Sequence, residues 1–90
     1  MITKDERNLL RFAEFFKTSR KKMFLSQQEM ADLLNVSAMT ISRMENGQKA
    51  PDLLFLLRYA EVLHRSLGDI LNEIGFESDM ESTEDRKKVG

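Results

Sequence analysis

Arg43 is the side chain in the middle of this sequence best suited to specific recognition, because it stands in the short, nearly neutral segment AMTISRME. A guanidinium is a rigid fork of donors that fits two acceptors on one partner, such as a carboxylate, a phosphate or the O6 and N7 atoms of guanine. Ala38 and Met39, just before it, offer apolar contact of the kind made with a thymine methyl group. Together these three side chains are suited to binding the surface of another molecule.

Residues for catalysis or metal binding are lacking. The 90 residues include one histidine and no cysteine, with no glycine-rich phosphate loop and no cluster of carboxylates. His64 stands at a predicted helix end, where a histidine is more often a charge partner of the helix C-terminus than a ligand or base. We therefore predict that the protein is not an enzyme, and we expect no cofactor, no metal and no small-molecule ligand.

Arg43 is carried by residues 26–47, SQQEMADLLNVSAMTISRMENG, which indicate two short helices joined by a tight turn. Ser26 and Glu29 have the capping-box spacing that starts a helix. Asn35 follows the last apolar residue of that helix and tolerates the left-handed conformation that ends one. Ser37 then caps a second helix over about 37–46, and Asn46-Gly47 stops it.

The apolar residues of both helices recur at three- and four-residue steps, which places them on one face. We expect Ile41 and Met44 to pack back on the first helix, whereas Ala38, Met39, Ser42 and Arg43 project the other way. The residues expected on the buried face of the first helix are Met30, Ala31, Leu33 and Leu34.

Three further helices are predicted around this pair. Capping signals begin them near Lys4, after Asp52 and after Ser66, and Gly75 ends the last. In the first of them Leu9, Phe12, Ala13 and Phe16 form the apolar stripe, widened by Leu10 and Phe15. The predicted buried residues of the second are Leu53, Leu56, Leu57, Ala60 and Leu63, and those of the third are Leu67, Ile70, Leu71 and Ile74.

Two short helices with this turn form a helix-turn-helix. Residues 9–74 resemble the phage repressor and Cro family, also called the XRE family of bacterial regulators, and Asn35 departs from it where the family often has glycine. The resemblance implies an all-α, compact five-helix lambda-repressor-like DNA-binding domain over residues 1–76, with its motif at 26–47. The matching positions are Gln27, Ala31, Val36, Ile41, Glu45-Asn46-Gly47 and Pro51.

The resemblance also implies double-stranded DNA as the partner and assigns roles to residues. Arg20 would pair with Glu45 and face a phosphate. Gln27 would contact the DNA backbone and brace a side chain of the recognition helix. The predicted base-contacting residues are Ala38, Met39 and Arg43. The predicted DNA-backbone contacts are Gln27, Arg20, Thr40, Ser42, Asn46 and Lys49. The alternatives are that Ala38 and Met39 only fill the surface of the helix and that Arg43 only balances the charge of Glu45.

Charge argues weakly against DNA binding, since the net charge is -1. The acidity lies toward the end of the chain. Residues 1–76 carry eleven Lys or Arg and ten Asp or Glu, whereas residues 77–90 carry three and five. We expect 77–90 to be a disordered tail. A local positive face is predicted from Lys17, Arg20, Lys21 and Lys22, which serve equally well as partners of a helix C-terminus.

The longest apolar run, LLFLL at 53–57, is far shorter than the ~20 residues of a membrane span. Without cysteine, a secretion signal or a membrane segment, the expected location is the cytoplasm. The expected function is that of a repressor that binds a palindromic operator as a homodimer, with Ile70, Leu71, Ile74 and Phe76 as one candidate interface. Two alternatives are the antitoxin of a toxin–antitoxin pair and a helical protein-interaction module without DNA binding, so that a toxin or antirepressor is a possible partner.

Overall fold

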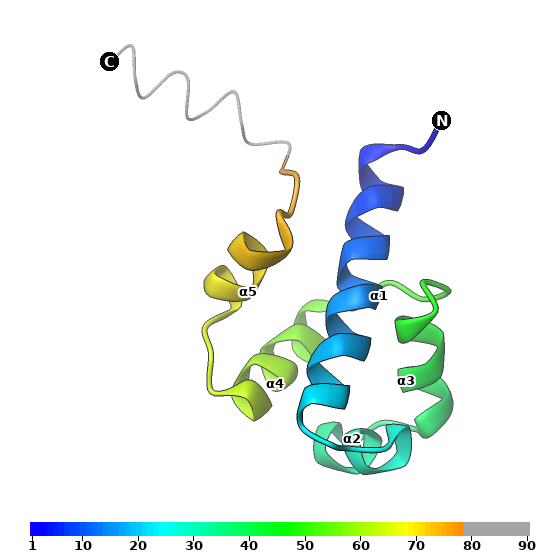
Figure 1. The fold of residues 1–90 in the computed structure, drawn as a ribbon, viewed down its shortest axis with the longest axis vertical. Coiled ribbons are helices and arrows are strands. Elements are labelled where there is room, and N and C mark those ends of the chain that lie inside the picture. Colours follow the sequence, from blue (N-terminus) through cyan, green and yellow to red (C-terminus); the bar gives the residue numbers. More distant parts are fainter. Residues whose placement is uncertain (79–90) are drawn as a thin grey trace.

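The structure, a computed structural model, describes residues 1–78, and within them the chain forms helices and no strand. In the view of Figure 1 the long helix α1 runs between α3 at the right and α5 at the left. Residues of α4 line one hollow together with residues of α2 and α3. The predicted all-α, five-helix fold is confirmed for this part of the chain. The helices are α1 (Lys4–Lys22), α2 (Gln27–Leu34), α3 (Ala38–Glu45), α4 (Leu53–Leu63) and α5 (Leu67–Ile74).

Helix α1 supplies the aromatic side chains at the centre of the core. It starts with the predicted capping box, in which Thr3 and Glu6 satisfy each other's backbone amides. Phe16 is 2% exposed, and its ring lies 4.8 Å from Tyr59 and 5.4 Å from Phe55, both on α4. These ring contacts join α1 and α4 around one core, because large aromatic surfaces are removed from water together.

The turn between α2 and α3 has the predicted conformation. Asn35 ends α2 in the left-handed region at φ 58°, and the amide of Val36 donates back to the carbonyl of Ala31 at 3.0 Å. That bond satisfies a free carbonyl of the last turn of α2. Ser37 then accepts a hydrogen bond from the amide of Thr40 and begins α3 without a linker. The tight turn holds the two helices at a fixed crossing.

The contact between α2 and α3 is made by buried apolar side chains, among them the small Ala31. Ala31 and Met30 are fully buried, and Ile41 and Met44 on α3 are 2% and 3% exposed. The expectation for Leu33 is wrong, since this side chain is 57% exposed. Leu33 lies one position from the buried face of a helix only eight residues long, and that face is already filled.

In α4 the predicted buried face is partly wrong. Phe55 and Tyr59 are buried with Ala60, whereas Leu53 and Leu57 are 64% and 43% exposed. Both sets follow the same helical spacing, so periodicity alone could not choose between them. The larger aromatic surfaces take the core position beside Phe16 of α1, and the leucines are left outside. Leu56 and Leu63 are half-buried at the edge of the core. A smaller error concerns Leu10 of α1, which is exposed.

Helix α5 closes the core with Ile70, which is 2% exposed. Ser66 caps the amide of Asp69 as expected. The reciprocal half of the predicted capping box is absent, because the Asp69 carboxylate pairs with Arg65 at 2.7 Å instead. Gly75 ends the helix in the left-handed region at φ 73°.

The chain beyond α5 returns to α1, and this corrects the predicted start of the tail at Glu77. The side-chain amide of Asn8 donates to the carbonyl of Glu77 at 2.9 Å and accepts from its backbone amide at 2.8 Å. The Glu77 carboxylate pairs with Arg7 at 2.8 Å and with Arg11 at 2.9 Å. Glu77 therefore belongs to the folded domain. The rest of the predicted tail, from residue 79 on, lies outside the described residues.

Candidate nucleic-acid interface

Helix α3 is held by one face and presents the other outward. Ile41 and Met44 are buried against α1 and α2, which form the inner side of the helix. Met39 is 61% exposed, and Arg43, one turn further along, is also exposed. Arg43 forms no ion pair with any residue in 1–78. An arginine without an ion pair in the described part of the chain is available to an outside acceptor.

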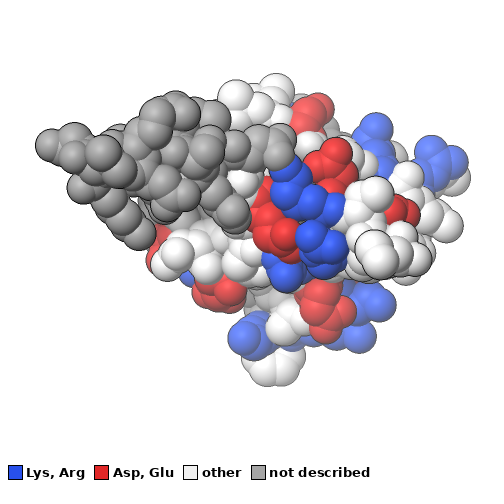
Figure 2. Space-filling view, turned by 90° about the horizontal axis from the view of Figure 1, so that it is seen from above, with Lys and Arg blue, Asp and Glu red and all other residues white. Residues whose placement is uncertain are grey.

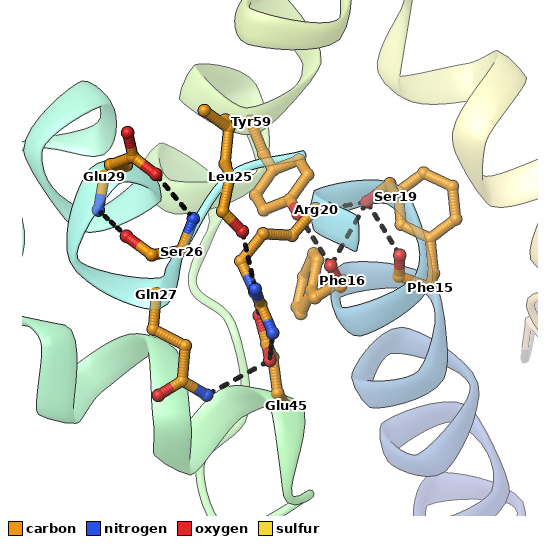
Figure 3. A network of polar contacts seen from close by, with 10 residues as sticks. All are labelled: Phe15, Phe16, Ser19, Arg20, Leu25, Ser26, Gln27, Glu29, Glu45 and Tyr59. Atoms are coloured by element: carbon orange, nitrogen blue, oxygen red, sulfur yellow. Dashed lines mark hydrogen bonds and ion pairs between the residues drawn. The ribbon is translucent and has the colours of Figure 1, made fainter. Parts of the chain in front are cut away.

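The C-terminal end of α3 is tied to α1 by an ion pair (Figure 3). Arg20 donates from Nε and Nη2 to both carboxylate oxygens of Glu45, at 2.6 and 3.0 Å. Gln27, the first residue of α2, donates to Oε1 of the same carboxylate at 3.3 Å. The structure thus brings together three of the sequence-selected residues, one from each of α1, α2 and α3. Such a bidentate pair restricts both side chains to one geometry.

Arg20 is turned inward, which corrects the expectation that it faces a DNA phosphate. Its third nitrogen, Nη1, donates to the carbonyl of Leu25 at 2.7 Å, and the side chain is only 11% exposed. The hydrogen bonds to Glu45 are the main cause of a raised pKa of the Arg20 guanidinium. The charge of Arg20 is matched by the buried Glu45 carboxylate, and the pair fixes α3 from its buried side.

A second polar group supports the last turns of α1 beside Arg20 (Figure 3). The Tyr59 hydroxyl donates to the carbonyl of Phe16 at 2.9 Å and lies 3.0 Å from the Ser19 hydroxyl. Burial, which disfavours the charged form, raises the pKa of Tyr59 to about 12. This hydroxyl therefore stays neutral near neutral pH and serves to dock α4 on α1.

The residues predicted to contact bases are placed differently from one another. Met39 and Arg43 lie on the exposed face of α3. Ala38 is half-buried and packs against the core cluster, so the expectation that it projects outward is wrong in part. Ala38 is the first residue of the helix, where the chain has just left the turn and the backbone is still close to α2. Its methyl group is therefore only partly exposed.

The residues predicted to contact the DNA backbone also differ in availability. Asn46 and Lys49 are exposed at the end of α3 and in the loop that follows. Thr40 and Ser42 are half-buried, and the Thr40 hydroxyl lies 3.0 Å from that of Ser37. The Thr40 and Ser37 hydroxyls thus form a pair at the start of α3, where the helix dipole favours negative charge.

Charges of both signs are mixed on the face of the molecule that Figure 2 shows. Viewed from the end that carries the start of α1, Lys and Arg alternate with Asp and Glu and no face of one sign is visible (Figure 2). In the basic cluster predicted before the motif, Lys21 and Lys22 are exposed and Lys17 is half-buried. Arg20 forms a buried ion pair with Glu45 and so adds no free positive charge to the surface. The predicted positive face is reduced by one residue.

Two features near this site had no signal in the sequence. The carbonyl of Leu25 accepts from Arg20, an interaction that any residue type could supply. Phe24, in the turn between α1 and α2, adopts the left-handed conformation at φ 58° with its ring 93% exposed. Aromatic residues are rare in that region of backbone space, so no residue pattern points to it.

Comparison with known proteins agrees with this architecture. The profile of the helix-turn-helix family matches residues 16–70, which include all of α2, α3 and α4. No curated protein matches the sequence. A solved structure of similar fold is that of the clp gene regulator ClgR from Corynebacterium glutamicum; it has a TM-score of 0.68 and 23% identity, and the match covers 91% of this chain and 88% of that one.

Among residues 1–78 none of the helices has the length and apolar character of a membrane span.

The family match spans more than half of the chain and contains the turn at Asn35, the ion pair of Arg20 with Glu45 and the outward face of α3. The protein belongs to the XRE-type helix-turn-helix family of DNA-binding transcription regulators.

Proposed function

We propose that the protein is a repressor that binds a near-palindromic operator in double-stranded DNA as a homodimer. The observation that carries this proposal is the exposure of Met39 and Arg43 on α3, a helix fixed from behind by Ile41 and Met44. An α-helix fits the major groove of B-form DNA, where each base pair presents a distinct pattern of donors and acceptors. Occupying an operator blocks access to the promoter beside it.

Within this proposal Arg43 reads a guanine, since arginine pairing with O6 and N7 is the commonest specific contact. Met39 and the edge of Ala38 contact thymine methyl groups nearer the start of the helix. The phosphates flanking the half-site are met by Gln27, Thr40, Ser42, Asn46 and Lys49, which supply affinity more than specificity. Arg20 has no direct contact with DNA and acts by fixing the end of α3.

A homodimer follows from the short reach of one eight-residue helix. Helix-turn-helix proteins commonly bind two half-sites about 34 Å apart, and the symmetry of the protein matches that of the operator. Two copies of α3 on the same side of a dimer double the number of base pairs that are read. The dimer thereby gains selectivity that a single α3 lacks.

Selection from random duplex DNA with the purified protein tests this function. We expect a consensus with two inverted half-sites, each containing a G·C pair at a fixed place. We also expect the logarithm of the affinity to fall steeply as the logarithm of salt concentration rises, because several phosphate contacts release counterions together. Selection that enriches no consensus would contradict the proposal.

The near-neutral net charge favours one other function, a protein-interaction module that kept the fold without binding DNA. A domain with a net charge of -1 gains less from the DNA field than a basic one. Low-salt binding to pooled duplex DNA separates the two functions. Undetectable binding there would favour the interaction module.

A further inference from the structure

Phe24, in the turn between α1 and α2, has a backbone conformation that is unusual for its residue type. The amide of Leu25 donates to the carbonyl of Arg20 at 3.3 Å, and the amide of Phe24 donates to the carbonyl of Lys21 at 3.0 Å. This pair of bonds is a Schellman motif, and the residue in the place of Phe24 is most often glycine. With φ at 58°, the Cβ of Phe24 strains the chain at the end of α1.

The fold itself does not account for an aromatic residue in this place. Asn35 and His64, the other described non-glycine residues at positive φ, belong to types that tolerate the left-handed region, whereas phenylalanine does not. The Phe24 ring is 93% exposed and packs on no other ring within residues 1–78. Backbone strain of this kind occurs preferentially at functional sites. The ring is available for contact with another molecule.

The groups that flank Phe24 favour an anionic partner. Lys21 and Lys22 precede it, are exposed and form no ion pair within the described chain. Ser26 follows and begins α2, so the partial positive charge of a helix N-terminus lies on the other side. Glu29 is acidic, but its carboxylate already accepts the amide of Ser26 at 2.8 Å. An apolar ring between positive groups matches the DNA backbone, in which deoxyribose alternates with phosphate.

We propose that the Phe24 ring packs on a deoxyribose of the DNA backbone beside the half-site, between phosphates contacted by Lys21 and Gln27. The inference rests on the DNA binding of the proposed function and assigns a contact residue in the turn before α2. Gln27, the α2 residue expected at the DNA backbone, lies three residues further on, and its side chain reaches Glu45 of α3 (Figure 3). The contact at Phe24 is therefore continuous with the interface expected for α2 and α3.

The place of this turn in the fold agrees with such a contact. In Figure 1 the connection from α1 to α2 lies at the end of the molecule where α3 begins. Met39, near the start of α3, is 61% exposed on the face proposed to enter the major groove. A duplex seated on that face has a backbone strand on either side of α3, because the major groove is about 12 Å wide. The strand beside the start of α2 is the one proposed to meet Phe24.

An apolar contact with the backbone differs from a charge contact in two measurable ways. Packing on a sugar is the same for every base, so it adds affinity without sequence preference. It also releases no counterion, so its loss leaves the dependence of affinity on salt unchanged. Loss of the Lys21 charge, in contrast, should reduce that dependence by one phosphate contact.

Fluorescence anisotropy of a labelled duplex of random sequence, titrated with the full chain at several salt concentrations, tests the contact. We expect Phe24→Gly to lower the affinity about three- to tenfold at every salt concentration, although it relieves the strain. Phe24→Ala, which keeps the strain without the ring, should lose affinity to the same extent. His64→Gly is the matched control, since it also places glycine at an exposed helix end with φ 57°, and it should bind as tightly as the wild type.

Phe24→Trp provides a direct observation of the contact, because the sequence contains no tryptophan. The larger ring should keep the affinity within about twofold of the wild type, and its fluorescence should change when the duplex is added. Leu33→Trp, at a site on α2 that is 57% exposed, is the control and should not respond.

The outcomes separate this contact from DNA binding itself. Equal affinities of the wild type, Phe24→Gly and Phe24→Ala would overturn the contact while DNA binding stands, as would an unchanged fluorescence of Phe24→Trp. A loss in Phe24→Gly alone would also overturn it, because the backbone and not the ring would then be responsible. A wild type that binds no duplex even at low salt would refute the DNA binding of the proposed function, and this contact with it.

Discussion

Arg20 and Glu45 form a buried bidentate ion pair that joins the last turn of α1 to the last turn of α3. Their side chains are 11% and 1% exposed, and the two hydrogen bonds are 2.6 and 3.0 Å long. Removing two charges from water is costly, and the pair balances that cost only while both partners are present. The geometry of α3 therefore depends on a contact made on the opposite side from its outward face.

We expect Glu45→Ala to lower the free energy of unfolding by about 3–5 kcal/mol, because it leaves the Arg20 guanidinium buried without a counter-charge. Urea denaturation followed by circular dichroism measures the change.

Glu61→Ala, at an exposed carboxylate on α4, is the control and should alter stability by less than about 0.5 kcal/mol. The double variant Arg20→Met with Glu45→Leu should lose less stability than Glu45→Ala, since no unpaired charge remains. Equal stability of Glu45→Ala and the control would show that the pair is dispensable.

Arg43→Ala should change operator choice without changing stability. Arg43 is exposed and forms no ion pair within residues 1–78, so the substitution removes no ion pair from that part of the fold. Loss of a bidentate contact to guanine costs ~1–3 kcal/mol at one base pair. Binding to duplexes that differ at each position measures this cost.

Lys49→Ala is the comparison for Arg43→Ala. Loss of a phosphate contact weakens binding to all sequences alike and reduces the salt dependence by one contact. Selection with the Arg43→Ala protein that returns the wild-type consensus would refute the base-reading role.

Ala31→Glu should unfold the domain. Ala31 is fully buried where α2 crosses α3, so a longer side chain has no space and its carboxylate has no partner. We expect the free energy of unfolding to fall by more than about 4 kcal/mol, which is much of the stability of a small domain. Thermal unfolding monitored at 222 nm on the circular dichroism spectrum reports the loss.

Asp32→Glu is the matched control, since it places a glutamate one residue away on the exposed side of α2. It should melt like the wild type. An Ala31→Glu protein with unaltered melting would mean that the two helices do not cross at this residue.

Phe24→Gly should stabilise the domain. Phe24 has φ 58° and is 93% exposed, so it carries the strain of the left-handed region with almost no packing in return. Glycine relieves strain of about 1–2 kcal/mol and loses part of this gain to the greater freedom of the unfolded chain. A net gain of about 0.5–1 kcal/mol in urea denaturation is expected.

Phe24→Ala keeps the strain and removes the ring, so it separates the two effects. It should be close to the wild type. A loss of stability in both variants would indicate that the ring makes an energetically important contact.

Acid sensitivity of the fold should depend on Glu77. Hydrogen bonds from Arg7, with the charge of Arg11, lower the pKa of this carboxyl from its ordinary value of 4.5 to about 2. The folded state thus binds the proton less readily than the unfolded state. The stabilisation is fully present above pH 4.5 and is lost as the pH falls toward 2.

We expect Glu77→Gln to flatten the fall of unfolding free energy across this acidic range, measured by urea denaturation at each pH. Glu61→Gln is the control and should leave the slope as it is. Part of the slope should persist in the Glu77 variant, because capping hydrogen bonds also lower the pKa values of Glu6 and Glu29. An unchanged slope would contradict the importance of the contacts made by Glu77.

Local sequence signals predicted the helices and the turns well. The capping residues Thr3, Ser26 and Ser37 begin their helices where expected, and Asn35 takes the left-handed conformation that ends α2. Each of these features depends on hydrogen bonds between residues two to four apart, which are formed by the local chain whatever surrounds it. The motif at 26–47 is such a feature almost from end to end, and for that reason it was recognisable.

Burial and pairing between distant residues were decided in three dimensions. The leucines and aromatic residues of α4 satisfy the same period, and only the position of Phe16 on α1 selects Phe55 and Tyr59 for the core. Likewise, the contact of Glu77 with Arg7 joins residues 70 apart in the chain, and no pattern of residue spacing predicts a contact over that separation. Such contacts depend on which surfaces the folded helices bring together, and a pattern within one helix contains no information about its neighbours.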